Sequence, residues 1–242
     1  MCERLSGVAS VQLTKRLTFS AFDLASRLPP KFGIIHLAEY VFEDQGFKPV
    51  DDALADVDEL LMNGVLQNRS GSPLAIGIWL RALAAKAGLD ASFIQFPDLS
   101  ILKCRAGEER IFLDLRQRGK VLNRGEMLEL LQKNQPKSDN ISFEPLQEEA
   151  VVARYLKRLG LEYQDRGDDL RALVVYDALI ELQPKSLSVL KDRSMAYYRL
   201  GRKNEALQDL KRFFSFSAPD QQPPELLQIY SALQRETGHP PA

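Results

Sequence analysis

Few residues in this chain could serve as a nucleophile or as a general base. It holds two cysteines, Cys2 and Cys104, and two histidines, His36 and His239. A histidine beside a cysteine can activate the thiol, so Cys104 with His36 is one candidate pair. Cys104 lies in an apolar run typical of a strand, where a cysteine usually serves as a small buried hydrophobic residue. We therefore expect no catalytic role for Cys104. Because no cysteine and histidine lie at the separations typical of zinc sites, we also expect no metal and no cofactor.

Ser72 is a second candidate nucleophile, at the start of the most apolar segment. It precedes Pro73, and the pattern predicts a helix that ends at Gly88. A serine hydroxyl can accept a hydrogen bond from an amide of the first turn, and proline fits the first helical position. Since no histidine is placed to activate Ser72, we expect an N-cap. The helix is apolar nearly all round, so it should be buried, with Trp79 in the core.

Short elements surround this central helix. Apolar residues at helical spacing predict helices over 19–28, 32–42, 57–66 and 124–133. Apolar runs bounded by turn residues predict strands over 91–96, 100–104 and 110–115. We therefore expect an α+β domain over residues 1–136, in which a small antiparallel sheet packs on the central helix. A polar stretch with two prolines, 134–148, is typical of a linker.

The C-terminal part repeats itself at an offset of 34 residues. That period, with small and large residues in this order, resembles a tetratricopeptide repeat and predicts helical hairpins over 149–242. Helices are expected over 150–166, 169–182, 187–200 and 203–214, with a capping helix over 225–236. The repeated pairs are Leu156 and Leu190, Tyr163 and Tyr197, Gly167 and Gly201, Ala172 and Ala206, and Leu173 and Leu207.

The order of these parts resembles the SirB-type family, in which a transglutaminase-like domain precedes tetratricopeptide-like repeats. The resemblance rests on Val-Leu-Gln-Asn-Arg-Ser-Gly-Ser-Pro-Leu over 65–74, Phe96-Pro97, Gly46-Phe47 and Ile-Phe-Leu-Asp over 111–114. It implies a cysteine nucleophile at the start of the buried helix, a histidine base after Phe-Pro and an acid that orients the histidine.

Two of these three implied positions lack the required residue type. Ser72 stands in place of the cysteine, and Asp98 and Leu99 follow Phe-Pro where the histidine would be. Only Asp114 matches the orienting acid. The resemblance thus implies the fold and argues against the reaction. An enzyme that uses Ser72 with Asp98 or Asp114, such as a cysteine-peptidase-like or acyl-transfer enzyme with an altered nucleophile, remains the alternative.

The repeats offer a binding surface. The first helix of each hairpin should line the concave side, and basic groups beside Met and Tyr suit an acidic or amphipathic peptide. A short array could instead pack on the first domain, because about three repeats usually make a free-standing stack. The residues expected on this surface are Arg154, Lys157, Leu161, Gln164, Asp165, Lys191, Met195, Tyr198 and Arg199.

Composition is consistent with such a role. The formal net charge is -1 and the basic residues are dispersed, which argues against nucleic acid and anionic membranes as partners. The N-terminus leads into no apolar stretch of signal-peptide length, so a cytoplasmic protein is expected. We expect a non-catalytic interaction or regulatory protein that binds a protein or peptide through the repeat groove or an inter-domain cleft.

Overall fold

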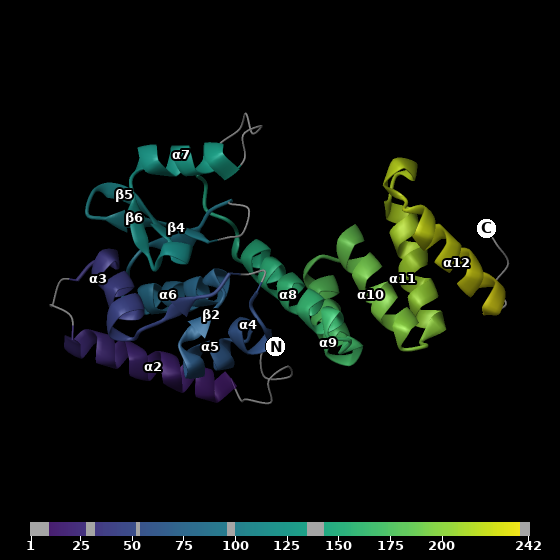
Figure 1. Ribbon diagram of the computed structural model, residues 1–242, viewed down its shortest axis with the longest axis horizontal. Coiled ribbons are helices and arrows are strands. Elements are labelled where there is room, and N and C mark those ends of the chain that lie inside the picture. The colour runs from purple at the N-terminus through teal and green to yellow at the C-terminus, as the bar shows by residue number, and fades with distance from the viewer. Residues whose placement is uncertain (1–9, 28–31, 52–53, 96–99, 135–142, 238–242) are drawn as a thin grey trace. The chain divides into compact units, whose positions relative to one another are not determined.

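The computed structural model describes residues 10–27, 32–51, 54–95, 100–134 and 143–237 (Figure 1). The chain divides into two compact units, Cys2–Val151 and Val152–Ala242. The predicted positions Asp98 and Leu99, and also Cys2 and His239, lie outside the described residues.

The central element of the first unit is helix α6. As the sequence predicts, Ser72 is its N-cap and Pro73 its first residue, and Trp79 is buried. Gly77 marks a close approach, because an added Cβ would lie 2.5 Å from Leu115 Cδ1 and 2.8 Å from Phe93 Cζ. The helices of the unit are α2 (Ser10–Arg27), α3 (Ile34–Glu39), a π-helix η1 (Tyr40–Asp44), α4 (Val57–Leu60), α5 (Met62–Asn68), α6 (Pro73–Lys86), the 3-10 helix η2 (Leu115–Gln117) and α7 (Arg124–Asn134).

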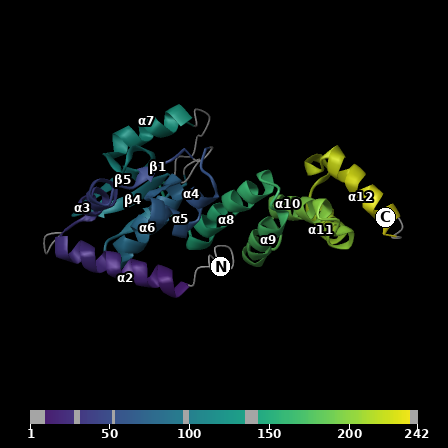
Figure 2. The same ribbon diagram turned by 60° about the horizontal axis from the view of Figure 1, so that its bottom comes forward.

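A four-stranded antiparallel sheet lies between α6 and α7 (Figures 1 and 2). Its strands, in order, are β3 (Ala91–Phe93), β4 (Ile101–Ala106), β5 (Glu109–Asp114) and β6 (Lys120–Leu122). The first three strands match the expected runs, whereas the short β6 was not expected. Phe112 and Met127 belong to the core cluster beneath α7.

The segment before helix α8 (Glu148–Asp165) covers the edge of this sheet. Pro145 forms a bridge with Ile94, and the Leu146 amide donates to the Phe93 carbonyl at 2.8 Å. Lys103 Nζ donates to the Phe143 carbonyl at 2.8 Å. Although the composition of 134–148 is typical of a linker, its last part therefore lies along β3.

Two further short strands were also not expected from the sequence. β1 (Lys48–Pro49) and β2 (Ser70–Gly71) form a parallel pair, with Lys48 opposite Ser70 and Pro49 opposite Gly71. Each strand has two residues, too few to show an alternating pattern. The pair matters because β2 leads directly into α6.

The second unit is helical. Successive helices from α9 to α12 are neighbours (Figures 1 and 2). None of the helices within the described ranges of the chain is both long enough and apolar enough to cross a membrane. The elements are α8 (Glu148–Asp165), which begins in the first unit, α9 (Asp169–Leu182), α10 (Leu187–Arg199), α11 (Lys203–Phe216), the 3-10 helix η3 (Pro219–Gln221) and α12 (Pro224–Glu236).

The turns after α8 and α10 have the same geometry. Gly167 and Gly201 both adopt a left-handed conformation, with φ of 73° and 72°. The Asp168 amide donates to the Tyr163 carbonyl at 2.8 Å, and the amide of Arg202 donates to the carbonyl of Tyr197 at 2.9 Å. The 34-residue offset of the sequence is thus also an offset in backbone geometry. Ala172 and Ala206, which follow these turns, are both fully buried.

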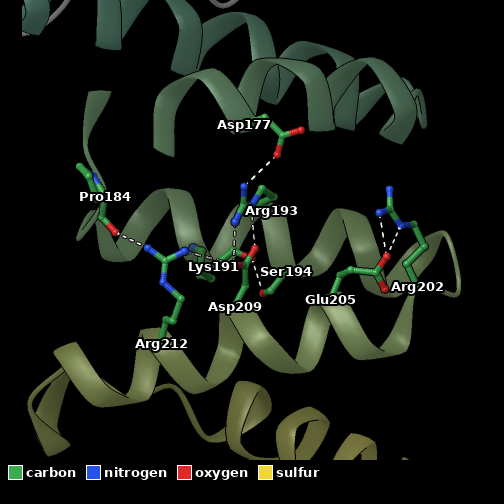
Figure 3. A network of polar contacts seen from close by, with 9 residues as sticks. All are labelled: Asp177, Pro184, Lys191, Arg193, Ser194, Arg202, Glu205, Asp209 and Arg212. Atoms are coloured by element: carbon green, nitrogen blue, oxygen red, sulfur yellow. Dashed lines mark hydrogen bonds and ion pairs between the residues drawn. The ribbon is translucent and has the colours of Figure 1, made fainter. Parts of the chain in front are cut away.

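Ion pairs link the helices of this unit. Arg193 of α10 donates to both carboxylate oxygens of Asp209 on α11, each at 2.7 Å, and to Asp177 of α9 at 2.8 Å (Figure 3). Arg212 donates to the Pro184 carbonyl at 2.8 Å. One guanidinium thus joins three consecutive helices.

Candidate functional site

Ser72 lies at the start of α6, and both its side-chain oxygen and its backbone amide form hydrogen bonds. Its Oγ accepts a hydrogen bond from the Ala75 amide at 3.2 Å, and its own amide donates to the Glu59 carbonyl at 2.9 Å. The residue is 1% exposed. This is the geometry of an N-cap, as the sequence predicts.

The residues before Ser72 hold it in this position. Asp56 and Glu59 form a reciprocal cap at the start of α4, and the Glu59 carboxylate also accepts from Ser70 Oγ at 3.1 Å. Gly71 must be small, since an added Cβ would lie 2.8 Å from the Glu59 carbonyl oxygen and 2.6 Å from Val65. The chain therefore enters α6 along a tightly packed path.

Asp114, the predicted orienting acid, is fully buried at the end of β5. Its carboxylate accepts from the Arg116 amide at 3.0 Å and from Gln117 Nε2 at 2.9 Å. These bonds cap the turn of η2. Among the described residues, neither Asp114 nor any imidazole forms a hydrogen bond with Ser72.

Ser100 immediately precedes β4. It is fully buried, and its carbonyl accepts from the Leu115 amide at 2.9 Å. The start of β4 is therefore held against η2, next to the turn that Asp114 caps.

The alternative pair, Cys104 and His36, is not brought together in a hydrogen bond. Cys104 is buried in β4, and burial raises the pKa of its thiol, with the charge of Asp90 adding to the shift. His36 is exposed, and its Nδ1 accepts from the Gly33 amide at 3.3 Å. A thiol with a raised pKa is a poor nucleophile at neutral pH. No group of three or more potential metal ligands occurs in the described parts of the chain.

The residues predicted to bind a partner lie on α8 and α10, and we call them the α8–α10 face. On each helix they recur at spacings that share one side. None of these eight side chains is buried. The α8–α10 face comprises Arg154, Lys157, Leu161, Gln164, Lys191, Met195, Tyr198 and Arg199.

Arg199 is committed to an ion pair that sequence reasoning missed. It donates to both carboxylate oxygens of buried Asp169, with Nη2–Oδ1 at 2.7 Å and Nε–Oδ2 at 2.9 Å. The carboxamide of Gln164 lies between the Tyr176 hydroxyl, at 2.8 Å, and this guanidinium. Arg199 is therefore partly a structural residue. The carboxamide of Gln164 on α8 lies beside the Arg199 guanidinium of α10.

Asp192 is a second acid beside the α8–α10 face that was not among the predicted residues. It is 8% exposed, and its Oδ1 lies 3.7 Å from Lys191 Nζ. Burial raises the pKa of Asp192, and the charges of Lys191 and Lys157 offset only part of that shift. Lys157 on α8 thus contributes to the electrostatic environment of Asp192 on α10.

Comparisons with known proteins identify the larger part of the chain. The chain is 25% identical over 205 residues to the UPF0162 protein YchA of Escherichia coli strain K12, which is 84% of this chain and 76% of that protein. It is 25% identical over 182 residues to a UPF0162 protein of Xylella fastidiosa strain Temecula1. That match covers 72% of this chain but only 64% of the relative. A family model described as the transglutaminase-like superfamily matches residues 11–157, which is more than half of the sequence. On that match, the chain belongs to the transglutaminase-like superfamily.

Proposed function

We propose that this protein is a non-catalytic member of its superfamily that binds a protein or peptide. The observation that carries the proposal is Ser72. It occupies the position where the resemblance places the nucleophile, yet its hydroxyl caps α6 and is almost fully buried. A hydroxyl that already accepts a bond, and that forms no hydrogen bond with a base among the described residues, is poorly suited to attack a substrate.

The second part of the proposal is that α8 to α11 form two tetratricopeptide-like hairpins, with α12 as a cap. The matching turns at Gly167 and Gly201 and the buried Ala172 and Ala206 support it. Repeat arrays of this kind usually serve as binding platforms. The proposed division is a degenerate transglutaminase-like domain over 1–136 and a repeat domain over 149–242.

The α8–α10 face is the proposed binding surface, and an acidic or amphipathic peptide is the proposed partner. Two of its cations already face acids, Arg199 with Asp169 and Lys191 with Asp192. Lys157 and Lys191 are the cations whose charge can be removed without breaking a short hydrogen bond. Met195 and the exposed Tyr198 would contact the apolar side of the peptide.

Quantitative capture from an extract of the native cells tests this proposal. We compare the wild-type protein with Lys157→Gln/Lys191→Gln and with a control of equal charge change, Lys120→Gln/Lys211→Gln, at exposed positions outside the α8–α10 face. Glutamine is preferred to glutamate because an added negative charge would lie beside the buried Asp192. The first variant should lose the partner while the control retains it. Equal capture by both would move the binding surface elsewhere.

A second measurement addresses the enzymatic alternative directly. A fluorophosphonate probe labels activated serines, so the native protein should remain unlabelled at Ser72 by peptide mass spectrometry. Stoichiometric labelling of Ser72 would contradict the non-catalytic assignment and favour the altered-nucleophile enzyme.

A further inference from the structure

A cavity of about 390 Å³ lies in the first unit beside α6. Drug-sized ligands occupy pockets of roughly 300–1,000 Å³, so this volume suits a small molecule. Neither Ser72 nor any residue of the α8–α10 face lines it. Its lining residues are Lys15, Arg16, Phe19, Ser20, Gln45, Phe47, Leu66 and Trp79.

One wall of the cavity is the side of α2. Lys15 and Phe19 are four residues apart, as are Arg16 and Ser20, so all four side chains share one side of the helix. Phe19 is 73% exposed, which is unusual for a large apolar ring at the wall of a cavity. A ligand that covered Phe19 would remove apolar surface from water.

The floor of the cavity is apolar. Trp79 of α6 and Phe47 are both buried, and Leu66 of α5 lies beside them. Gln45 adds a polar group, and its position is fixed because its Nε2 donates to the Tyr40 hydroxyl at 2.8 Å. The cavity thus combines an aromatic floor with a fixed polar group, a combination that ligand sites commonly show.

The charge of the cavity wall is positive. Among the described residues of the lining, Lys15 and Arg16 are the charged ones, and neither forms an ion pair with another residue in the described ranges. Asp23, further along α2, does not neutralise them, because it accepts from Tyr40 Oη at 2.7 Å and from Arg27 Nε at 2.9 Å. Two cations beside an aromatic floor favour a ligand that has an anionic head and an apolar body.

We propose that this cavity binds a small amphipathic carboxylate, whose hydrocarbon body packs on Trp79, Phe47 and Phe19 and whose carboxylate meets Lys15 and Arg16. This site is independent of the proposed peptide-binding function. It requires no catalytic step, so the ligand would be held rather than converted.

The chain offers a direct reporter, because Trp79 is its one tryptophan. Octanoate is the probe, and octanamide is a neutral ligand of the same length. Titration with octanoate should change Trp79 fluorescence saturably, and octanamide should bind at least about tenfold more weakly, since the carboxylate supplies the charge-assisted contacts.

Variants assign the contacts. Lys15→Gln/Arg16→Gln should weaken octanoate binding by about tenfold or more and leave octanamide binding unchanged. The control Lys120→Gln/Arg124→Gln changes the charge equally at exposed positions outside the lining, and Lys157→Gln/Lys191→Gln changes only the α8–α10 face. Both controls should bind octanoate like the wild-type protein.

A third variant tests the apolar half of the site. Phe19→Ala removes an exposed ring, so circular dichroism should show an unchanged fold while both probes bind more weakly. The proposal is overturned if octanoate leaves the fluorescence of the folded wild-type protein unchanged, if octanamide binds equally well, or if removing Lys15 and Arg16 has no effect.

Discussion

Arg199, the last residue of α10, donates to both carboxylate oxygens of Asp169, the first residue of α9, at 2.7–3.0 Å. The pair joins two helix ends that are 30 residues apart in the chain. Asp169 is buried, so the loss of Arg199 would leave its charge without a partner.

We therefore predict that Arg199→Gln lowers the free energy of unfolding by about 1–2 kcal/mol. The value is below that of a fully buried pair because the Arg199 side chain is 38% exposed and solvent screens part of the interaction. Urea denaturation provides the measurement. Arg166→Gln should change stability by less than about 0.5 kcal/mol, because the Arg166 side chain is 50% exposed and Glu162 keeps its pair with Arg158. Equal effects of the two substitutions would contradict the structural role of Arg199.

The two acids that meet Arg193 should differ strongly in their effect on stability. The Asp209 side chain is 3% exposed and that of Asp177 is 56% exposed. Asp209→Ala should cost about 3–5 kcal/mol, because it leaves a guanidinium that is only 13% exposed without its main partner. Asp177→Ala should cost at most about 1 kcal/mol. Thermal or urea unfolding of the two variants side by side would test this ranking, and a larger loss for Asp177→Ala would refute it.

Asp192 should make the second unit less stable as the pH rises. Burial raises its pKa in the folded protein above the reference value of 3.8. The folded state therefore binds this proton more tightly, and its advantage is lost as the pH increases from about 3.8 through the folded pKa. The stability of the wild-type protein relative to Asp192→Asn should fall over this range, which urea unfolding at a series of pH values can measure.

Glu162 provides a control of opposite sign. Burial would raise its pKa, but hydrogen bonds from Arg166 and Arg158 outweigh burial and lower the pKa below 4.5. Its contribution is present above pH 4.5 and is lost as the pH falls through the folded pKa. The stability relative to Glu162→Gln should therefore rise with pH. If the stability of the wild-type protein relative to Asp192→Asn rose with pH, as it should relative to Glu162→Gln, the raised pKa assigned to Asp192 would be wrong.

Ser72→Ala should lower the free energy of unfolding by about 1 kcal/mol, because the Ala75 amide loses its acceptor at a buried helix start. The loss is compared with that caused by Ser92→Ala, the same substitution at the half-buried middle residue of β3. Chemical denaturation gives both values. A Ser72→Ala protein as stable as the wild type would mean that the hydroxyl is retained for a reason other than capping.

Features set by neighbouring residues could be predicted from the sequence, and features set by distant contacts could not. The start of α6 is encoded locally by Ser72 and Pro73, and the turn after α8 by Gly167. The β1–β2 pair joins two dipeptides about twenty residues apart, so no local pattern marks it.

The same reason explains what was missed on the α8–α10 face. Lys191 and Arg199 were expected from the repeat period, which also predicts the side of each helix. Their acids, Asp192 and Asp169, could not be assigned from that period, because it does not specify which charges meet. The helices can thus be predicted from the sequence. Which cations on their surface are paired with acids can be seen only in the structure.

The bridge between Pro145 and Ile94 also bears on the exposure of the sheet edge. An open sheet edge presents unpaired amides and carbonyls that can recruit another chain and start aggregation. Here the edge at β3 is occupied by the protein's own backbone, because Pro145 bridges Ile94 and the Leu146 amide bonds the Phe93 carbonyl. Pro145 itself has no amide hydrogen to offer to a further strand. Detachment of 143–146 would expose β3, so agents or substitutions that release this segment should promote fibrillar association before the helical core unfolds.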